Sequence, residues 1–164
     1  MEKYHFFWGG IYSNWYKSPF KIDIAGVEIE FNCVEQYMMY SKAILFKDFE
    51  IAAEIMNCSN PRDQKALGKE VRNFDIKVWE EKRIYIVSKG ISAKFLQNED
   101  LQKQLMQEDC KEFVEASPYD RIWGIGYSEK DALENIPYWG ENLLGKIITD
   151  LRDSIVRIEQ GIIS

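Results

Sequence analysis

The sequence is poor in the residues that support metal and disulfide chemistry. Its 164 residues include a single histidine, His5, and three widely spaced cysteines, Cys33, Cys58 and Cys110. This odd number and wide spacing predict reduced thiols rather than a disulfide framework or a zinc site. A cysteine nucleophile would need a histidine partner, and His5 is the only candidate. We therefore expect no metal, no other cofactor and no cysteine-based catalysis.

Long apolar runs and basic clusters are also missing. No stretch approaches the roughly 20 apolar residues of a membrane span, and residues 1–5 lack the basic-then-apolar layout of a secretory signal. We expect a cytoplasmic protein with no membrane contact and no obligate protein partner. The net charge of -6 argues against broad binding to nucleic acid, whose phosphates favour clustered lysine and arginine. A modified base presented locally remains compatible with this charge.

The sequence has no visible internal repeat or linker, and 46% of its residues are hydrophobic. This composition is sufficient for the core of one globular domain that spans residues 1–164. Apolar and polar residues alternate in 22–24 and 27–31 about Ala25-Gly26, which predicts a β-hairpin. A helix should follow at once, with Asn32 as its cap and Glu35 at its third position.

Helical periodicity covers most of the remaining chain. We expect further helices at about 48–56, 61–71, 75–96, 101–106, 129–135 and 144–161, and a strand at 111–115. Trp79 and Lys94 belong to one stripe of the longest helix and should share a face. The predicted fold class is therefore α+β, predominantly helical, with a small antiparallel sheet.

The most informative segment runs from Glu115 to Gly126 and combines acids, a large aromatic ring and two glycines. Pro118 starts a turn, because proline presets its own backbone angle and excludes the preceding residue from the helical region. Asp120 and Trp123 follow, and Gly124 permits close approach of the backbone to a ligand. The segment fits a loop that holds a flat or phosphorylated small molecule. It fits equally a surface turn with a buried tryptophan and a self-capping aspartate.

Glu35 and Lys42 form a second candidate pair. They are seven residues apart, so on a helix they share a face at about 10 Å along the axis, which leaves room for a sugar. Alternatively, Glu35 is a capping-box partner and Lys42 is a solvated lysine that covers apolar neighbours.

Residues 140–146 match the glycine–lysine spacing of a phosphate loop. Ile147 replaces the required hydroxyl residue and no hydrophobic strand precedes the segment, which argues against a nucleoside triphosphatase. Asn142 can still donate hydrogen bonds to a ligand, and we expect the nearby helix start to favour a phosphate.

These segments resemble, in order, the motifs of the NADAR family, also called YbiA-like. The matching residues are Ser13-Asn14-Trp15-Tyr16, Glu35-Gln36-Tyr37 with Lys42-Ala43, Lys94-Phe95, the Glu115–Gly126 signature, and Trp139-Gly140 followed by Asn142-Leu143-Leu144-Gly145 and Arg152. The resemblance spans nearly the whole chain. It implies a YbiA-like fold and an N-glycosidase that acts where ribose joins an amino-substituted heterocycle.

Two substrate classes are associated with the family. One is ADP-ribose on the exocyclic amine of guanine in nucleic acid, and the other is the phosphoribosylamino-pyrimidine intermediates of riboflavin biosynthesis. The resemblance implies that Glu35, Lys42 and Asp120 are catalytic. It implies a substrate-binding role for Ser13, Asn14, Trp79, Lys94, Trp123, Gly124 and Asn142.

Two catalytic routes are open from the residues. Glu35 and Asp120 could act as paired carboxylates, one on water or a cationic C1 and one on the leaving nitrogen. Alternatively, a neutral Lys42 could attack the opened sugar and displace the amine as a Schiff base. A non-catalytic module that binds ADP-ribose or a related nucleotide is the alternative function. Each interpretation predicts that Glu35, Lys42, Asp120 and Trp123 converge on one pocket.

Overall fold

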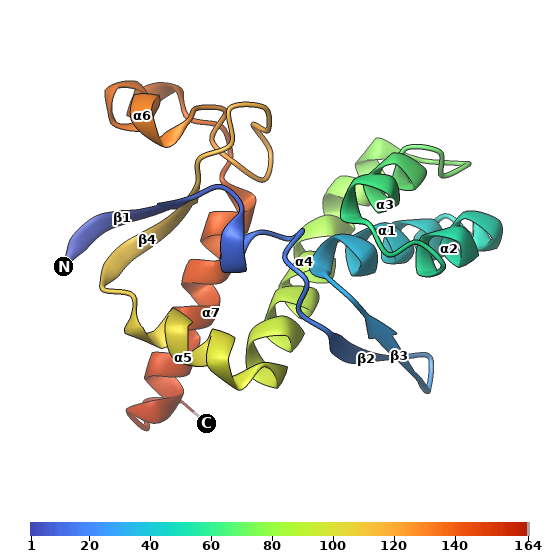
Figure 1. The fold of residues 1–164 in the computed structure, drawn as a ribbon, viewed down its shortest axis with the longest axis horizontal. Coiled ribbons are helices and arrows are strands. Elements are labelled where there is room, and N and C mark those ends of the chain that lie inside the picture. Colours follow the sequence, from blue (N-terminus) through green and yellow to red (C-terminus); the bar gives the residue numbers. More distant parts are fainter. Residues whose placement is uncertain (164) are drawn as a thin grey trace. The chain divides into compact units, whose positions relative to one another are not determined.

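The computed structural model describes residues 1–163, which form two compact units. One unit is residues 14–99, and the other combines residues 1–13 with the chain from Asp100 onward. Helices predominate, and each unit contains a two-stranded sheet (Figure 1). The predicted fold class is confirmed, whereas a single domain over residues 1–164 stays a prediction. Within residues 1–163, no helix is both long enough and apolar enough to cross a membrane.

The predicted hairpin is present in the unit of residues 14–99. Strands β2 (Phe20–Ile24) and β3 (Val27–Phe31) pair antiparallel, with Ile24 opposite Val27. The two turn residues, Ala25 and Gly26, both have positive φ angles, of 52° and 82°. Two such residues match the right-handed twist of the flanking strands, which closes the hairpin tightly.

Four helices complete this unit, close to their predicted positions. They are α1 (Val34–Leu45), α2 (Phe49–Met56), α3 (Pro61–Gly68) and α4 (Ile76–Gln97). The side chains of Asp48, Asn60 and Asp75 cap the last three by accepting backbone N–H bonds. These polar caps explain why the starts of α2, α3 and α4 are visible in the sequence.

The predicted start of α1 was wrong in detail. Cys33, not Asn32, is the N-cap residue, and Glu35 is the second helical residue rather than the third. Gln36 reaches back in place of Glu35, since its Oε1 accepts from the Asn32 backbone N–H at 2.8 Å. Gln36, at the third helical position, therefore takes the place that the capping-box interpretation gave to Glu35.

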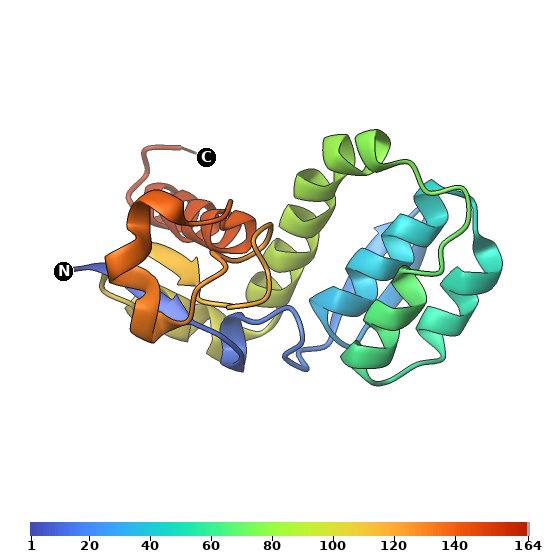
Figure 2. The ribbon, with the colours of Figure 1, turned by 90° about the horizontal axis from the view of Figure 1, so that it is seen from above.

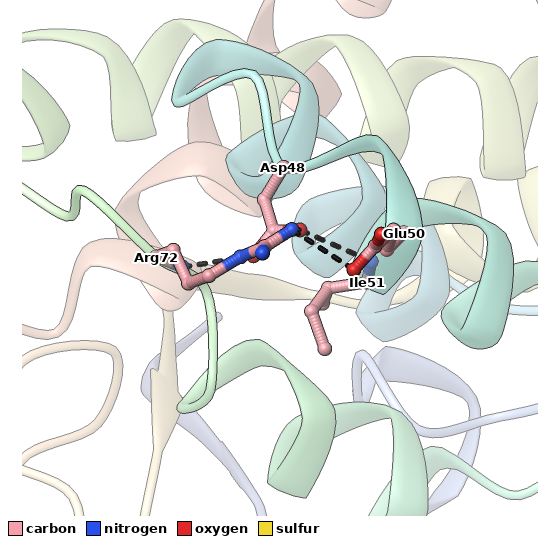
Figure 3. Close-up of polar contacts among 4 residues, drawn as sticks. All are labelled: Asp48, Glu50, Ile51 and Arg72. Atoms are coloured by element: carbon pink, nitrogen blue, oxygen red, sulfur yellow. Dashed lines mark hydrogen bonds and ion pairs between the residues drawn. The ribbon is translucent and has the colours of Figure 1, made fainter.

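A buried carboxylate joins the start of α2 to the segment after α3. The Asp48 side chain is fully buried and accepts from Arg72 Nη2 at 2.8 Å, Arg72 Nε at 3.2 Å and the Arg72 backbone N–H at 2.9 Å. The Ile51 N–H also donates to it, and Glu50 receives a second bond from Arg72 (Figure 3). These bonds, led by those from the Arg72 side chain, hold the pKa of Asp48 far below its usual range.

The other unit is built on a parallel pair of strands. β1 (Glu2–Phe7) pairs with β4 (Cys110–Glu115), with Phe6 opposite Val114. Its helices are η1 (Gly10–Tyr12), α5 (Glu99–Gln107), α6 (Glu129–Ala132), η2 (Leu133–Tyr138) and α7 (Leu143–Glu159). β1 was not predicted, because its pairing partner lies about a hundred residues away and no local pattern marks it.

α7 packs along β4, and the two elements lie side by side in both views (Figures 1 and 2). Thr149 Oγ1 accepts from the Phe113 N–H at 2.9 Å and donates to the Gly145 carbonyl at 2.8 Å. Gly145 lies at the closest approach, where an added Cβ would come within 2.1 Å of the Phe113 carbonyl oxygen. Only glycine fits between this helix and this strand.

We predict that Gly145→Ala destabilises the protein, although glycine-to-alanine changes inside helices usually stabilise by about 1 kcal/mol. The new methyl group must push α7 away from the β4 backbone, and such overpacking lowers the free energy of unfolding by about 1–3 kcal/mol. Urea unfolding measures this change. Ser154→Ala in the same helix is the control and should change it by no more than about 0.5 kcal/mol. A Gly145→Ala variant as stable as the wild type would contradict the packing argument.

Candidate functional site

The N-terminal turn of α1 buries a carboxylate beside an unsatisfied amide. Glu35 is only 4% exposed, and its backbone N–H donates to the Asn14 carbonyl at 3.0 Å. Asn14 is 7% exposed, and its side-chain Oδ1 is a buried acceptor with no hydrogen-bond partner among residues 1–163. A buried acceptor without a donor is unfavourable by about 1–3 kcal/mol, so this oxygen is suited to receive a hydrogen bond from a ligand.

Lys42 lies two helical turns further along α1, half-buried among aromatic rings. Its Nζ donates to the Gly68 carbonyl at 2.6 Å and lies 4.5 Å from the Phe74 ring centroid and 6.0 Å from that of Trp79. Burial lowers the pKa of Lys42, and the negative charge of Glu35 opposes this effect. Glu35 and Lys42 therefore interact electrostatically across the face of α1 that the sequence predicted.

Lys94 of α4 is completely buried. Its Nζ lies 5.1 Å from the Phe95 ring centroid and 5.7 Å from that of Tyr16. Burial lowers its pKa to about 7, so the amine is about half neutral near physiological pH. Burial also raises the pKa of the nearby Cys33 thiol to about 11, and that thiol donates to Gln64 Oε1 at 3.2 Å.

In the other unit, the signature loop is held together by Asp120. Its Oδ1 accepts from the N–H groups of Ile122 and Trp123, both at 2.8 Å, so the self-capping interpretation of this aspartate is realised. An added Cβ at Gly124 would lie 2.8 Å from the Glu115 carbonyl oxygen, so this glycine serves packing of the loop on β4. The half-buried Asp120 has a second carboxylate oxygen, Oδ2, to which no hydrogen bond is directed within residues 1–163.

Asn142, just before α7, uses its amide on the backbone of β4. Its Nδ2 donates to the Phe113 carbonyl at 3.1 Å and its Oδ1 accepts from the Glu115 N–H at 3.0 Å. These bonds give Asn142 a structural role, and its substrate-binding role stays a prediction.

The expected phosphate site at the start of α7 is wrong. The N–H groups of residues 141–144 donate to the carbonyls of Arg121, Gly124, Ile122 and Trp123, in that order, at 2.8–3.1 Å. Phosphate binding at a helix N-terminus needs several backbone N–H groups directed at the ligand. Here the signature loop already accepts from them, so loop and helix stabilise each other instead.

The ten candidate residues divide evenly between the units. Asn14, Glu35, Lys42, Trp79 and Lys94 belong to residues 14–99, whereas Ser13, Asp120, Trp123, Gly124 and Asn142 belong to the other unit. The structure brings Asn14 next to Glu35, and Lys42 next to Trp79. The convergence of Glu35 and Lys42 with Asp120 and Trp123 stays a prediction, as do the roles of all ten residues.

Two residues near the candidates were missed in the sequence. Arg83 is 8% exposed on α4, four residues after Trp79 and on the face that carries Lys94. A charged residue within a buried stripe is a usable signal, because arginine is rarely buried without a purpose. Phe74, which covers the Lys42 amine, lies in a loop and had no such signal. Residues 1–163 contain no group of three or more His, Cys, Asp or Glu placed to hold a metal ion.

Comparison with known proteins supports a common ancestry over almost the whole chain. The mimivirus protein N-glycosidase R617, from Acanthamoeba polyphaga mimivirus, is 43% identical over 164 aligned residues, which cover 93% of this chain and 96% of that protein. Protein irg-1 of Caenorhabditis elegans is 35% identical, with 88% of this chain and 75% of the relative covered.

The fold is shared with a solved structure as well. The NMR structure of the Escherichia coli protein YbiA matches with a TM-score of 0.76 at 26% identity, covering 98% of this chain and 89% of that one. The family model described as the NADAR domain matches residues 6–156. The chain therefore belongs to the NADAR domain family.

Proposed function

We propose that this protein is an N-glycosidase that hydrolyses the bond between ribose C1 and the amino nitrogen of a heterocycle. The two substrate classes are ADP-ribosylated guanine, as a nucleotide or in nucleic acid, and the phosphoribosylamino-pyrimidines of riboflavin biosynthesis. Relatives named N-glycosidases support the reaction type. The observation that carries it here is the pair on one face of α1, a buried Glu35 carboxylate and a half-buried Lys42 amine with a lowered pKa.

The two substrate classes share one reactive bond. In both, a sugar C1 is bonded to a nitrogen outside an aromatic ring. Such an N-glycoside opens to an imine when the ring oxygen leaves C1 and takes a proton, and it can also break to a ribosyl cation. A site that provides a carboxylate and an amine near C1 suits either pathway, which is why one pocket can serve both classes.

The carboxylate route uses Glu35 on the attacking water. Its carboxylate accepts a proton as the water oxygen bonds to C1, while the C1–N bond breaks and the leaving nitrogen takes a proton from a second acid. We retain Asp120 as the predicted second acid. Burial of Glu35 excludes competing water, which strengthens its interaction with positive charge that develops at C1.

The amine route uses Lys42 on the ring-opened imine. Neutral Lys42 adds to C1, the heterocyclic amine leaves with a proton, and C1 remains bound to Lys42 as a Schiff base. Water then adds to C1, the lysine is released, and the sugar recloses with its new hydroxyl group. Lys42 is better placed for this attack than Lys94, because Lys42 is only half-buried whereas Lys94 has no exposed surface. The lowered pKa of Lys42 increases the neutral fraction that the route requires.

Incubation with three compounds tests the proposed function. ADP-ribosylated guanine DNA, NAD and a ribosylamino-pyrimidine phosphate are each supplied, and the products are resolved by chromatography and mass spectrometry. We expect the ADP-ribosylated guanine DNA or the ribosylamino-pyrimidine phosphate to release its intact heterocyclic amine and a free sugar. Tight binding of ADP-ribose, added in a separate titration, with no turnover of the three compounds would instead identify a binding module. We also propose that the protein acts in the cytoplasm.

We predict that Glu35→Gln lowers kcat by about a hundredfold or more, because loss of a general acid or base commonly has this effect. The amide is nearly isosteric, so the fold should persist and substrate binding should change less than turnover. Steady-state kinetics and circular dichroism measure the two. Glu134→Gln, at an exposed position of η2, is the control. Wild-type kcat in Glu35→Gln would remove the carboxylate from the mechanism.

We predict that borohydride added during turnover traps the sugar on Lys42, which is seen as a mass increase on its peptide. Lys42→Arg should abolish trapping and turnover together, since a guanidinium stays protonated and cannot attack C1. Lys47→Arg, an exposed lysine just after α1, is the control and should leave both unchanged. Full activity in Lys42→Arg would limit Lys42 to an electrostatic role. An adduct on Lys94 would move the nucleophile to α4.

We predict that Lys94→Met raises the thermal stability by several degrees, because burial disfavours the ammonium of Lys94. The direction of the pH effect on stability follows from the number of protons that the folded and unfolded chains bind. Below pH 7 both the folded and the unfolded chain hold the proton, so the penalty of burial is complete. Between about pH 7 and pH 10 Lys94 has lost its proton in the folded protein but keeps it in the unfolded chain. The stability of the wild type therefore rises with pH relative to that of Lys94→Met.

Thermal melts of both proteins from pH 6 to pH 10 measure this difference. The gap in Tm between Lys94→Met and the wild type should be largest at pH 6 and narrow towards pH 10. A gap that is constant with pH would show that the Lys94 amine keeps its ordinary pKa in the folded protein.

A further inference from the structure

A second site lies in residues 14–99, away from the candidate residues. It is a groove of about 330 Å³ between α1, α4 and the turn of the β2–β3 hairpin. Its principal lining residues are Tyr37, Tyr40, Ile44, Tyr85, Ile86 and Lys89. The size falls within the range of small-molecule sites, and a lining of aromatic and apolar side chains with few polar groups is typical of them.

The groove is on the far side of α1 from the proposed chemistry. At 100° per residue, Tyr37, Tyr40 and Ile44 project about 140–180° around the helix axis from Glu35 and Lys42. On α4, the groove residues Tyr85 and Lys89 likewise project about 80° or more from Trp79, Arg83 and Lys94, whereas Ile86 projects only about 20° from Trp79. A molecule held by Tyr85 and Lys89 therefore lies off the face that carries Trp79, Arg83 and Lys94.

The floor of the groove is an apolar, closely packed surface. Tyr37 is 4% exposed and lies so close to Gly90 of α4 that an added Cβ there would approach its ring to 2.6 Å. Burial raises the pKa of the Tyr37 phenol. By contrast, Tyr85 is 70% exposed at the rim and offers a large ring with little protein covering it. A flat aromatic molecule is the ligand that such rings stabilise, through offset or edge-on contacts.

The polar groups of the groove select the charge of the ligand. Lys89 is exposed and takes part in no ion pair within residues 1–163. The lining also contains one acid, Asp23, whose Oδ1 accepts from the Gly26 N–H at 2.9 Å in the hairpin turn. An anionic group that contacts Lys89 gains an ion pair and phenolic hydroxyl donors, whereas one beside Asp23 does not.

We propose that this groove is a binding site for a planar aromatic acid, whose rings rest on the tyrosines and whose anionic group pairs with Lys89. The inference concerns binding alone and is independent of the proposed N-glycosidase activity.

Naphthalene-2-sulfonate is a suitable probe, since it is a bicyclic aromatic anion. We expect saturable changes in the amide NMR resonances of Tyr40, Ile44, Tyr85 and Lys89 of the full chain. Tyr85→Ala should weaken binding by about tenfold, and Lys89→Met by about threefold to fivefold, as for an exposed ion pair. Lys77→Met and Ile84→Ala, at exposed α4 positions that do not line the groove, are the matched controls and should leave the Kd unchanged. Glu35→Gln should bind naphthalene-2-sulfonate with the same Kd as the wild type.

Three outcomes would overturn the proposal. The first is the absence of saturable resonance changes in the folded wild type. The second is a set of changes that lies outside the groove or persists unaltered in both Tyr85→Ala and Lys89→Met. The third is equal or tighter binding of the uncharged 2-methylnaphthalene or of the cation 2-naphthylmethylammonium, which would contradict the assigned charge.

Discussion

The arrangement of residues 14–99 depends on a polar network at the buried start of α1. Cys33, Gln36 and Gln64 are each at most 4% exposed, so their polar groups must find partners inside the protein. Gln36 joins the end of β3 to the end of α2, since it accepts from the Asn32 N–H and donates to the carbonyls of Ile55 and Cys58. Gln64 of α3 accepts from the Cys33 thiol and donates to the Asn32 side chain. Hairpin, α1, α2 and α3 are thereby tied at one point.

This network determines what Glu35 can do. A glutamate in the first turn of a helix normally stays in water or reaches back to cap the helix, and both leave its carboxylate unreactive. Here Gln36 performs the reach-back, and the Glu35 backbone is held by the Asn14 carbonyl. The carboxylate is therefore buried on a rigid turn, and Lys42 follows it at the spacing of two helical turns. Rigid placement of reactive groups favours catalysis, because orientation is paid for during folding rather than during the reaction.

The sequence predicted those features that arise from local physics. The hairpin and the capped starts of α2, α3 and α4 have signals within a few residues, whereas α3 ends at Gly68, earlier than the predicted position 71. The cap of α1 was misjudged because a buried cysteine, which makes no side-chain capping bond, occupies the position. β1 was missed because its parallel partner β4 is distant in the chain, and parallel pairing leaves no turn between the strands.

The candidate site was predictable only in part, because contacts between residues far apart in the sequence leave no local signal. The spacing of Glu35 and Lys42 and the family motifs identify residues, but they do not reveal that Phe74 covers the Lys42 amine or that Lys94 is wholly buried. Asn142 shows the converse, since a motif residue proves to hold the backbone of β4. Motif membership alone therefore does not separate residues that contact a ligand from residues that shape the elements around it.

The two faces of α1 have opposite effects on the stability of the protein. Towards Glu35 and Lys42 the helix buries charge, which lowers stability unless a ligand or a network compensates, and the unpartnered Asn14 Oδ1 adds to that strain. Towards Tyr37 and Ile44 it buries rings against α4, and Gly90 brings the two helices close enough for Tyr37 to seal the contact. The apolar face provides the stability that the polar face gives up. A short helix carries both faces because α4, 22 residues long, packs against its apolar side.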